Sequence, residues 1–466
     1  MNAHRNSNIV SCKSLAASLA LLLLACAALC DDGTQTTAKA KATSKVRALT
    51  AKKTTGAASA PKGSGPTTAP HGPTTISPSH TATTTSHTTI QTKKPGLVTE
   101  RGQTATLHDP KRGMDIHHSL SGNRRVEVER PDHSRIVTER NGRGYVQKPY
   151  KYRGHEYAQR SYYYNGRYHQ AYYGRYQYHG VWVNPYYPAY YYAPAYYSWV
   201  SYPWGAPASY AWGWNVNPWF AYYGGFFTPF AVYPSASLWL TDYIIATSLA
   251  DAYQPQAAAL RNPAPLTPEI ERLIADEVHQ QLTLEFHESQ TAANGEPDAG
   301  SSSIQRMLTD GKPHVFIAGH DLDVVDAAGT ACALTEGDVI QLTGQTAPGA
   351  QAATLAVLAS KGGNECGKGD TVSVGLADLQ EMQNHLRETI DRGLQELRTK
   401  QGQGGLPVAP AAAKAPPVES PMAEIAPPPP PESEVAAQIA QQSQEADQAE
   451  KAASSNAAAA PGPNAP

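Results

Sequence analysis

The sequence predicts a mainly β protein with a few helices. A tyrosine-rich antiparallel β meander comes first, and a small C-terminal β barrel or half-open roll flanked by amphipathic helices follows, between long disordered termini. Three observations predict this fold class. Short segments alternate apolar and polar residues at period two, turn residues such as Gly, Asn and Pro separate these segments, and apolar residues recur at helical spacing in three later segments.

Residues 1–30 have the pattern of an export signal peptide. Arg5 and Lys13 precede an apolar segment of suitable length at residues 15–24. That segment is too short to span a membrane. The residues ending at Cys26 resemble the lipobox of bacterial lipoproteins, and this resemblance implies that Cys26 becomes the lipidated N-terminus of a membrane-anchored chain. The small residues beside Cys26 also fit a signal-peptidase site, so a soluble secreted form is the alternative.

Both ends of the chain have low-complexity composition. Residues 31–96 form a Thr/Ala/Lys-rich arm, with nine Lys and Arg and no acid between residues 33 and 96, and residues 402–466 form a Pro/Ala-rich tail. Such compositions bury too little apolar surface to offset chain entropy, so we expect both to be disordered. The basic arm is either a contact for anionic lipids and wall polymers, with nucleic acid the weaker alternative, or a solubilising spacer.

Residues 97–184 predict the antiparallel meander. Alternating segments lie at residues 97–101, 125–129 and 135–139, with hairpin-type turns between them. Alternation of apolar and charged residues is typical of half-buried strands. Asn165 and Gly166 form the clearest hairpin signal in the chain.

Residues 185–253 predict an aromatic, proline-rich wrap followed by a helix. All 26 tyrosines and all 7 tryptophans of the chain lie between Tyr145 and Tyr253, and residues 176–241 contain no Asp, Glu, Lys or Arg. The frequent prolines after Asn184 remove donors from a sheet. We therefore expect an irregular extended segment up to Pro234 and a helix over residues 235–253.

Residues 264–290 predict an amphipathic helix that begins at Pro268, and residues 304–401 predict a small β module with a final helix capped by Asp378. The module contains five short strands with glycine-rich turns, which suits a small barrel or half-open roll. Cys332 and Cys366 are the cysteines of the predicted folded part. In an oxidising compartment they would form a disulfide, and two unrelated thiols are the alternative.

No catalytic or metal-binding pattern withstands inspection. The zincin-like start at His155 has Gln159 where the second ligand is required. The acids between residues 321 and 326 lack the acidic twelfth ligand of a calcium loop. We predict no catalytic residue, no metal and no cofactor.

The aromatic residues are the candidate binding surface. Tyr and Trp rings stack on sugar rings or bases, and neighbouring arginines can hold an anionic glycan. The alternative is that the tyrosine-rich strands only pack on one another. The candidate binding residues are Tyr162, Tyr164, Arg167, Tyr168, Arg175, Trp199, Trp204, Trp212, Trp214 and Trp219.

Four segments carry a resemblance to a family: GYVQKPY at 144–150, PSASLWLTDY at 234–243, CALTEGD at 332–338 and DLQEMQN at 378–384. Between about residues 96 and 406 the chain resembles a group of exported, Tyr/Trp-rich bacterial proteins with no assigned activity. The resemblance implies export and a modular architecture, and it assigns no functional residue. Residues 322–342 are also faintly similar to bacterial SH3 modules, an analogy of fold alone, because the Asn-Val-Arg signature is missing.

These features predict an exported, cell-envelope-associated, non-enzymatic structural or binding protein, located in the periplasm, in the outer membrane or at the surface of a bacterium. It would act through its aromatic surface on a cell-wall or envelope polysaccharide. One alternative is an enzyme of envelope polymers that uses Asp321 or Asp323. Another is a protein that self-associates into a surface matrix.

Overall fold

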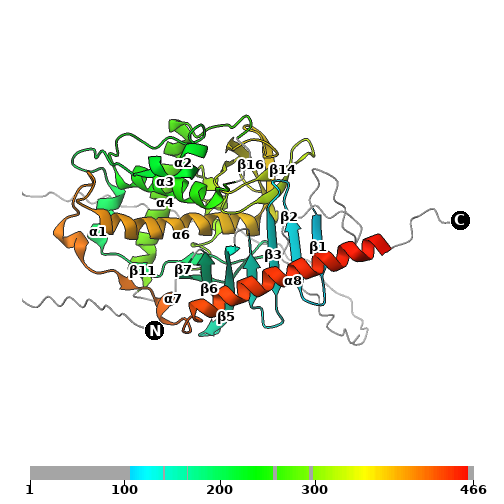
Figure 1. Ribbon diagram of the computed structural model, residues 1–466. Helices are drawn as coiled ribbons and strands as arrows, with labels where there is room; N and C mark the ends of the chain where they lie inside the picture. The colour runs from blue at the N-terminus through cyan, green and yellow to red at the C-terminus, as the bar shows by residue number, and fades with distance from the viewer. Residues whose placement is uncertain (1–104, 140–141, 165, 256–259, 293–297, 460–466) are drawn as a thin grey trace, which may run out of the picture. The chain divides into compact units, whose positions relative to one another are not determined.

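The computed structural model describes residues 105–139, 142–164, 166–255, 260–292 and 298–459. The predicted signal peptide, Cys26, the basic arm and the strand at residues 97–101 lie outside these residues. The described part is mainly β, with several antiparallel sheets and a few helices, as the sequence predicts (Figure 1). None of the helices in this part has both the length and the hydropathy needed to cross a membrane.

An eight-stranded antiparallel sheet confirms the predicted meander. Its strands pair in chain order and are β1 (Ala105–Asp109), β2 (Met114–His118), β3 (Arg124–Glu129), β4 (Arg135–Thr138), β5 (Gly144–Tyr152), β6 (His155–Tyr164), β7 (Arg167–Gly174) and the short β10 (Tyr186–Tyr187). Gly166, in the predicted β6–β7 hairpin, has a φ of +72°, a conformation that suits glycine. Asn165 lies outside the described residues.

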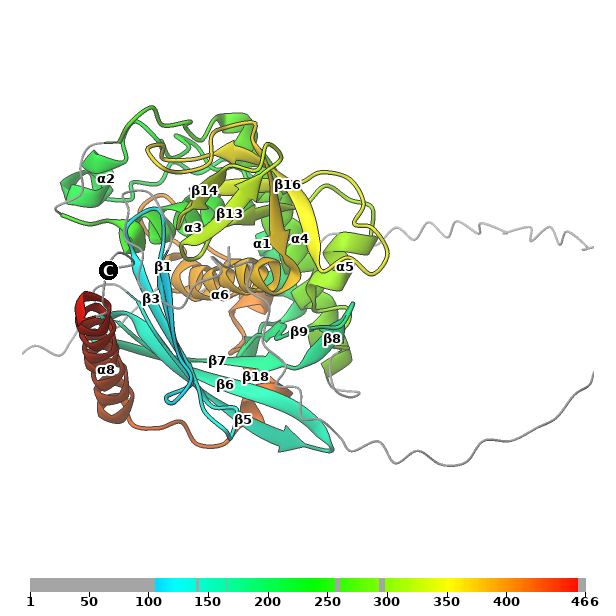
Figure 2. The same ribbon diagram turned by 90° about the vertical axis from the view of Figure 1, so that its right-hand side faces the viewer.

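Helices lie over both faces of this sheet, and β3 keeps the alternation expected of a half-buried strand, with Val126 and Val128 buried and Arg125 and Glu127 half-buried. Helix α8 (Glu432–Ala459) runs along one face, here called the outer face, and helix α6 (Leu376–Lys400) lies over the other, here called the inner face (Figure 2). Val126 and Val128 of β3 pack with α8 on the outer face. Arg125 points to the inner face, because successive side chains of a strand alternate. The charged side chains Arg125, Glu127 and Arg135 are therefore half-buried on the inner face.

The prediction of a disordered tail is wrong for residues 402–459. This part contains η3 (Ala411–Lys414), β18 (Val418–Glu419), α7 (Pro421–Glu424) and α8. The buried side chains of α8 recur every three or four residues, at Val435, Ile439, Gln442, Ala446 and Ala449. This stripe packs on aliphatic side chains of β2 to β5, and the burial offsets the chain entropy that the composition emphasises.

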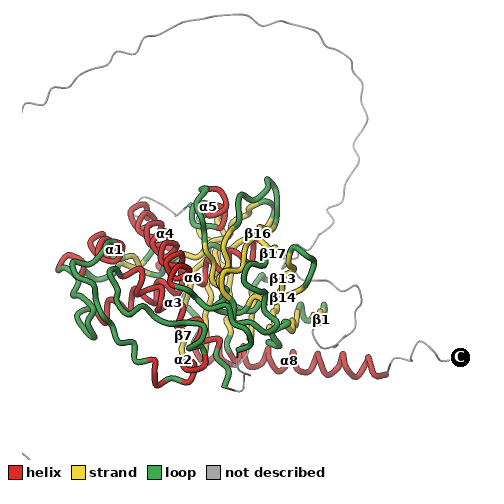
Figure 3. The backbone as a smooth tube through the Cα atoms, turned by 90° about the horizontal axis from the view of Figure 1, so that it is seen from above, coloured by secondary structure: helices red, strands yellow, loops and turns green. Residues whose placement is uncertain are grey.

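The aromatic segment forms the main core rather than a loose wrap. It contains β11 (Tyr190–Tyr191), α1 (Pro194–Ser201), η2 (Trp214–Val216) and α2 (Pro218–Tyr222), and it leads into α3 (Ala236–Ala252). The preceding strands β8 (Tyr176–Tyr178) and β9 (Val181–Val183) belong to a separate core with residues 304–382. Helices α1 and α2 begin with a proline, where its missing N–H is tolerated. The rings pack on α3, α4 (Pro268–Ala292) and α6. Figure 3 shows α1, α3, α4 and α6 close together.

A six-stranded antiparallel sheet forms the C-terminal module. Its order is β12 (Val315–Ile317), β15 (Val339–Leu342), β16 (Ala352–Ala359), β17 (Thr371–Gly375), β13 (Leu322–Asp326) and β14 (Ala331–Leu334), and α5 (Ile304–Thr309) precedes it. The order starts and ends on different strands, so the sheet is open. Helix α6 begins at Leu376 after the N-cap residue Gly375, so the predicted cap at Asp378 is wrong. Leu376 is fully buried, and its packing fixes the start of the helix.

Candidate functional site

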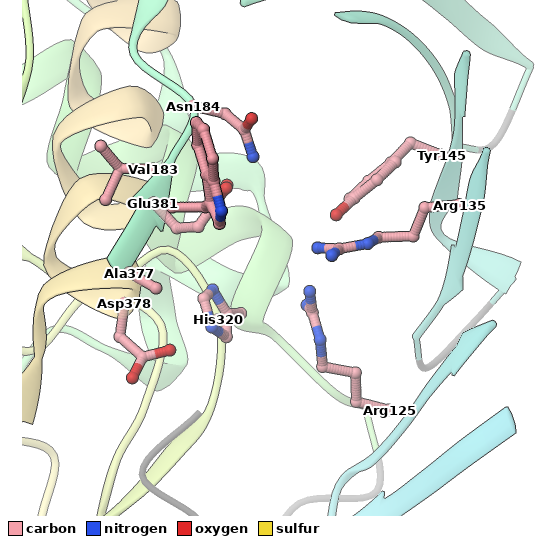
Figure 4. Close-up of a pocket in the computed structure, with 10 residues that line it drawn as sticks. Arg125, Arg135, Tyr145, Val183, Asn184, His320, Ala377, Asp378 and Glu381 are labelled. Atoms are coloured by element: carbon pink, nitrogen blue, oxygen red, sulfur yellow. The ribbon is translucent and has the colours of Figure 1, made fainter. Parts of the chain in front are cut away.

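A small polar cavity lies between the inner face of the eight-stranded sheet and the start of α6 (Figure 4). We call it the polar cleft. Its lining residues are Arg125, Arg135, Tyr145, Trp182, Val183, Asn184, His320, Ala377, Asp378 and Glu381. The centre of a water molecule can occupy about 20 Å³ of the cleft, which is room for about one water or for a terminal group of similar size.

Strand alternation places one wall of the cleft. Arg125 on β3, Arg135 on β4 and Tyr145 on β5 occupy inner-face positions on three adjacent strands. Figure 4 shows both guanidinium groups and the Tyr145 hydroxyl directed into the cavity. The opposite wall includes His320, from the loop between β12 and β13, and Asp378, from the first turn of α6. Segments far apart in the sequence therefore converge on one cavity.

Arg125 is held by Glu139, the residue that follows β4. Its Nη1 contacts Glu139, and Glu139 also accepts a hydrogen bond from Arg143 Nε at 2.7 Å. Burial raises the pKa of Glu139, but Arg143 and Arg125 outweigh burial and lower that pKa to about 2. Glu139 is therefore ionised at neutral pH and fixes the position of Arg125.

Arg135 and Arg160 are also paired. Arg135 reaches Glu127 at 3.2 Å through Nε and Glu129 at 3.5 Å through Nη2. Arg160 is only 1% exposed and makes two hydrogen bonds of 2.7 Å to Glu381 on α6. Burial raises the pKa of Glu381, but Arg160 outweighs burial and lowers it to about 2. This double ion pair joins α6 to the sheet beside the polar cleft.

His320 is the neutral member of the site. Burial lowers the pKa of its imidazole, and the charge of Arg125 lowers it further. The ring is therefore uncharged at neutral pH and offers one donor and one acceptor nitrogen. An adjoining hollow shares Arg125 and His320 and continues to Asn123 and Asp321.

The acids considered for an enzyme hold a turn in place. Asp321 accepts a hydrogen bond from the side chain of Asn123. Asp323 accepts the backbone N–H of Leu120 at 3.0 Å and contacts His117 Nε2 at 2.9 Å. These contacts attach the turn between β2 and β3 to the C-terminal module, so both acids have a structural role.

The structure does not gather the predicted binding residues of the sheet in one site. Tyr162 lies over the inner face, with its hydroxyl 2.9 Å from that of Tyr173. Tyr168 instead donates to a carbonyl of the linker before α8, on the outer face. Tyr164 and Arg167 pair at the end of the β6–β7 hairpin.

Arg175 packs on a residue that lines the polar cleft, as Tyr162 also does through Tyr145, whose ring centroid is 5.2 Å away. Its guanidinium carbon lies 4.4 Å from the ring centroid of Trp182, which lines the cleft. The same guanidinium contacts Glu156 at 3.0 Å. Arg175 therefore supports a wall of the cleft without lining it.

The predicted tryptophans form two groups within the aromatic core. Trp199 stacks on the buried Trp204 at a centroid distance of 5.7 Å. Trp212 stacks on Trp214 at 4.1 Å, and Trp214 lies 5.7 Å from Trp219. These three remain half-buried. Much of the ring area is used for packing inside the molecule, and neither group lines the polar cleft.

The predicted disulfide is confirmed. The sulfur atoms of Cys332 and Cys366 are 2.04 Å apart, and the bond joins β14 to the loop between β16 and β17. Within the described ranges, no group of three or more His, Cys, Asp or Glu side chains is arranged to hold a metal ion.

Sequence reasoning missed Arg125, Arg135, Tyr145 and His320 as site residues. A signal for the arginines was present, because two neighbouring predicted strands carry Arg and Glu at alternating positions and can pair their charges across the sheet. The position of His320 had no local signal, since it depends on how the C-terminal module packs on the meander.

Comparisons with protein-family models, with curated proteins and with solved structures find no match for this chain. The resemblance to exported Tyr/Trp-rich bacterial proteins and the SH3 analogy stay predictions. The chemistry of the polar cleft is therefore the main ground for a functional proposal.

Proposed function

We propose that this protein is an exported, cell-envelope-associated, non-enzymatic binding protein that holds an end group of its ligand in the polar cleft. One observation carries the proposal. The guanidinium groups of Arg125 and Arg135 and the hydroxyl of Tyr145 point into one small cavity rather than into bulk solvent (Figure 4). A few polar groups that converge on a cavity are characteristic of ligand sites.

Two features support the envelope as the compartment. The sequence pattern of residues 1–30 favours export, and Cys26 favours a lipid anchor in the periplasm, in the outer membrane or at the cell surface. The disulfide between Cys332 and Cys366 is the type of bond that persists in oxidising compartments. In that compartment the protein would meet envelope polymers, and those with polar end groups are the expected ligands.

A retention assay on isolated cell-wall and outer-membrane polymers tests this function. The full chain with Arg125→Gln is compared with wild type. Glu139 keeps its 2.7 Å contact with Arg143 in this variant, so we expect the protein to fold. Lys148→Gln is the matched control, because it removes one positive charge from the outer face of the same sheet.

We expect retention to fall only in the Arg125→Gln variant. Circular dichroism and the unfolding midpoint of each variant establish that the folded state is intact. Equal retention of all three proteins would reject the polar cleft as the binding site.

A second candidate retains the aromatic surface as the binding element. Val216 is 80% exposed, in a segment without charged side chains and beside the half-buried Trp214 and Trp219. Aromatic rings at such a surface stack on sugars, so a cell-wall polysaccharide is the expected partner. An uncharged apolar surface also favours self-association.

Val216→Asp separates this second candidate from the first. The variant places a charge on the aromatic surface without touching the core, and Val418→Asp is the control at a 70% exposed position. Retention lost with Val216→Asp alone would favour the aromatic surface. Retention or self-association that neither aspartate changes would reject it.

A further inference from the structure

We infer that the side chains of Lys361 and Asp338 become joined by an amide bond, which the chain forms by itself with Glu365 as the proton carrier. The three residues lie at one end of the six-stranded sheet, and none of them lines the polar cleft. Asp338 directly precedes β15, and Lys361 and Glu365 lie in the loop after β16. The inference goes beyond the proposed function and does not depend on the ligand of the cleft.

The amine and the carboxyl group are in contact inside the protein. Nζ of Lys361 donates to Oδ1 of Asp338, and Nζ lies 3.8 Å from Oε1 of Glu365. The side chain of Asp338 is fully buried, and that of Lys361 is 6% exposed. The ring centroid of the buried Phe226 lies 5.6 Å from Nζ. Two groups that can react are thus held together where little water reaches them, and such fixed proximity replaces a bimolecular encounter.

The contact starts as a buried ion pair. Burial lowers the pKa of the Lys361 amine, but Asp338 and Glu365 outweigh burial and raise it. Burial raises the pKa of the Asp338 carboxyl group, although Lys361 opposes this. Transfer of one proton from Nζ to Oδ1 gives a neutral amine and a neutral carboxyl group. An apolar environment favours this uncharged form, which is the reactive one.

Amide formation from the uncharged pair releases one water molecule. The lone pair of Nζ attacks Cγ of Asp338 and forms the C–N bond. The backbone N–H of Thr335 donates to Oδ2 at 2.7 Å, so it stabilises the negative charge that develops there. Glu365 accepts the second proton from Nζ and passes a proton to Oδ1. The Cγ–Oδ1 bond then breaks, Oδ1 leaves as water, and the nitrogen keeps its third proton.

Glu365 is suited to carry this proton. Burial and the charge of Asp338 raise its pKa to about 7, so both protonation states are populated at neutral pH. Its Oε1 accepts a hydrogen bond of 2.6 Å from Thr335 Oγ1. This hydrogen bond holds the carboxyl group near Nζ.

The amide bond would close residues 338–361 into a covalent ring. The neighbouring disulfide between Cys332 and Cys366 closes the same end of the sheet. The C-terminal module would then have two covalent closures, and the amide would survive conditions that reduce the disulfide.

Mass spectrometry of a tryptic digest of the full chain, after reduction of the disulfide, tests the inference. A chain without the bond yields residues 307–361, because trypsin does not cleave between Lys312 and Pro313. With the bond, Lys361 is an amide and resists cleavage. We therefore expect residues 307–368 as one peptide that lacks the mass of one water molecule. Chymotrypsin cleavage after Leu342 should leave two fragments that are still joined.

Glu365→Gln tests the proton carrier. The amide oxygen of the new side chain can still accept from Thr335 Oγ1, so we expect the variant to fold. The yield of the joined peptide should fall at least about tenfold. Glu396→Gln is the matched control, because it makes the same change at a half-exposed position on α6, and its yield should equal that of wild type.

Two outcomes would count against the inference. Residues 307–361 released from wild type with their full mass would overturn the amide and leave Lys361 and Asp338 as a buried ion pair. Equal yields of the joined peptide in wild type and Glu365→Gln would overturn the role of Glu365. If circular dichroism shows that Glu365→Gln does not fold, the wild-type digest decides the bond by itself.

Discussion

The two faces of the eight-stranded sheet consist of the same alternating strands but are covered in different ways. On the outer face, aliphatic side chains such as Val126, Ile136 and Val146 form small apolar clusters with α8. On the inner face, the buried Arg160 pairs with Glu381 of α6, and the half-buried Arg125 pairs with Glu139. One face is closed by burial of apolar area, and the other by specific ion pairs.

This difference predicts unequal responses to mutation. Apolar burial depends on area and depends little on direction. A buried ion pair depends on both partners, because removal of one leaves an uncompensated charge in a medium of low polarity. The inner face should therefore be the more sensitive face, and four substitutions can test that order.

The largest loss of stability is expected for a substitution of Arg160. Arg160→Met leaves Glu381 without its two 2.7 Å hydrogen bonds and removes the guanidinium from the rings of Tyr145 and Tyr173, at 4.7 and 4.1 Å. We expect the free energy of unfolding to fall by about 4 kcal/mol. Urea denaturation measures it. A loss below about 1 kcal/mol would contradict the dependence of the inner face on paired charge.

The next effect is expected on the outer face at Ile439. Ile439→Ala removes a buried apolar side chain of α8 from the cluster with Ile136 and Val146, and we expect the free energy of unfolding to fall by about 3 kcal/mol. Faster hydrogen exchange of the α8 amides should accompany it. Gln444→Ala on the exposed side of α8 is the control. If both variants exchange alike, α8 does not depend on this cluster.

A smaller, pH-dependent effect is expected at Glu388. Burial raises its pKa to about 7, against the opposing influence of the Tyr173 hydroxyl and of Arg160. The folded pKa lies above the unfolded value, so the stability from this proton is fully present below about pH 4 and is lost as pH rises through about 7. Glu388→Gln should be more stable than wild type by about 2 kcal/mol at pH 8, and equal to it at pH 4.

Denaturation curves between pH 4 and pH 8 measure this difference, and Glu396→Gln on the same helix is the control. Its carboxylate is 42% exposed. If the difference in free energy of unfolding between wild type and Glu388→Gln stays constant from pH 4 to pH 8, Glu388 does not titrate in this range.

The smallest effect is expected at Lys148, on the outer face. It lies 3.8 Å from Glu434 of α8, and both side chains are more than 40% exposed. Lys148→Met should change the free energy of unfolding by less than about 0.5 kcal/mol. A loss as large as that of Arg160→Met would remove the distinction between the two faces.

The strands and the main helices could be predicted because their signals are local. Alternation at residues 125–129 and 135–139 marks β3 and β4, and the Thr-Pro start marks α4. Helix α8 could also have been predicted, because Val435 and Ile439 begin an apolar stripe with a spacing of three and four residues. Its many Ala and Gln residues resemble a disordered tail and obscured that stripe.

The polar cleft could not be predicted in the same way. The alternation shows that Arg125 and Val126 point to opposite faces, but it does not show that both faces are covered. The meeting of Tyr145 with His320 and Asp378 depends on packing between segments far apart in the chain. The aromatic residues were the more prominent signal, and most of them serve the core.

The position of α8 also fixes when folding can be completed. The helix spans Glu432–Ala459, yet it closes the face of strands that begin at Met114. Because a chain is synthesised from its N-terminus, this aliphatic face stays uncovered until almost the whole protein has been made. Closing so long a loop is slow. A nascent or truncated chain that ends before residue 432 lacks α8 and therefore exposes the apolar face of the sheet. Such a chain should aggregate more readily than the full-length protein.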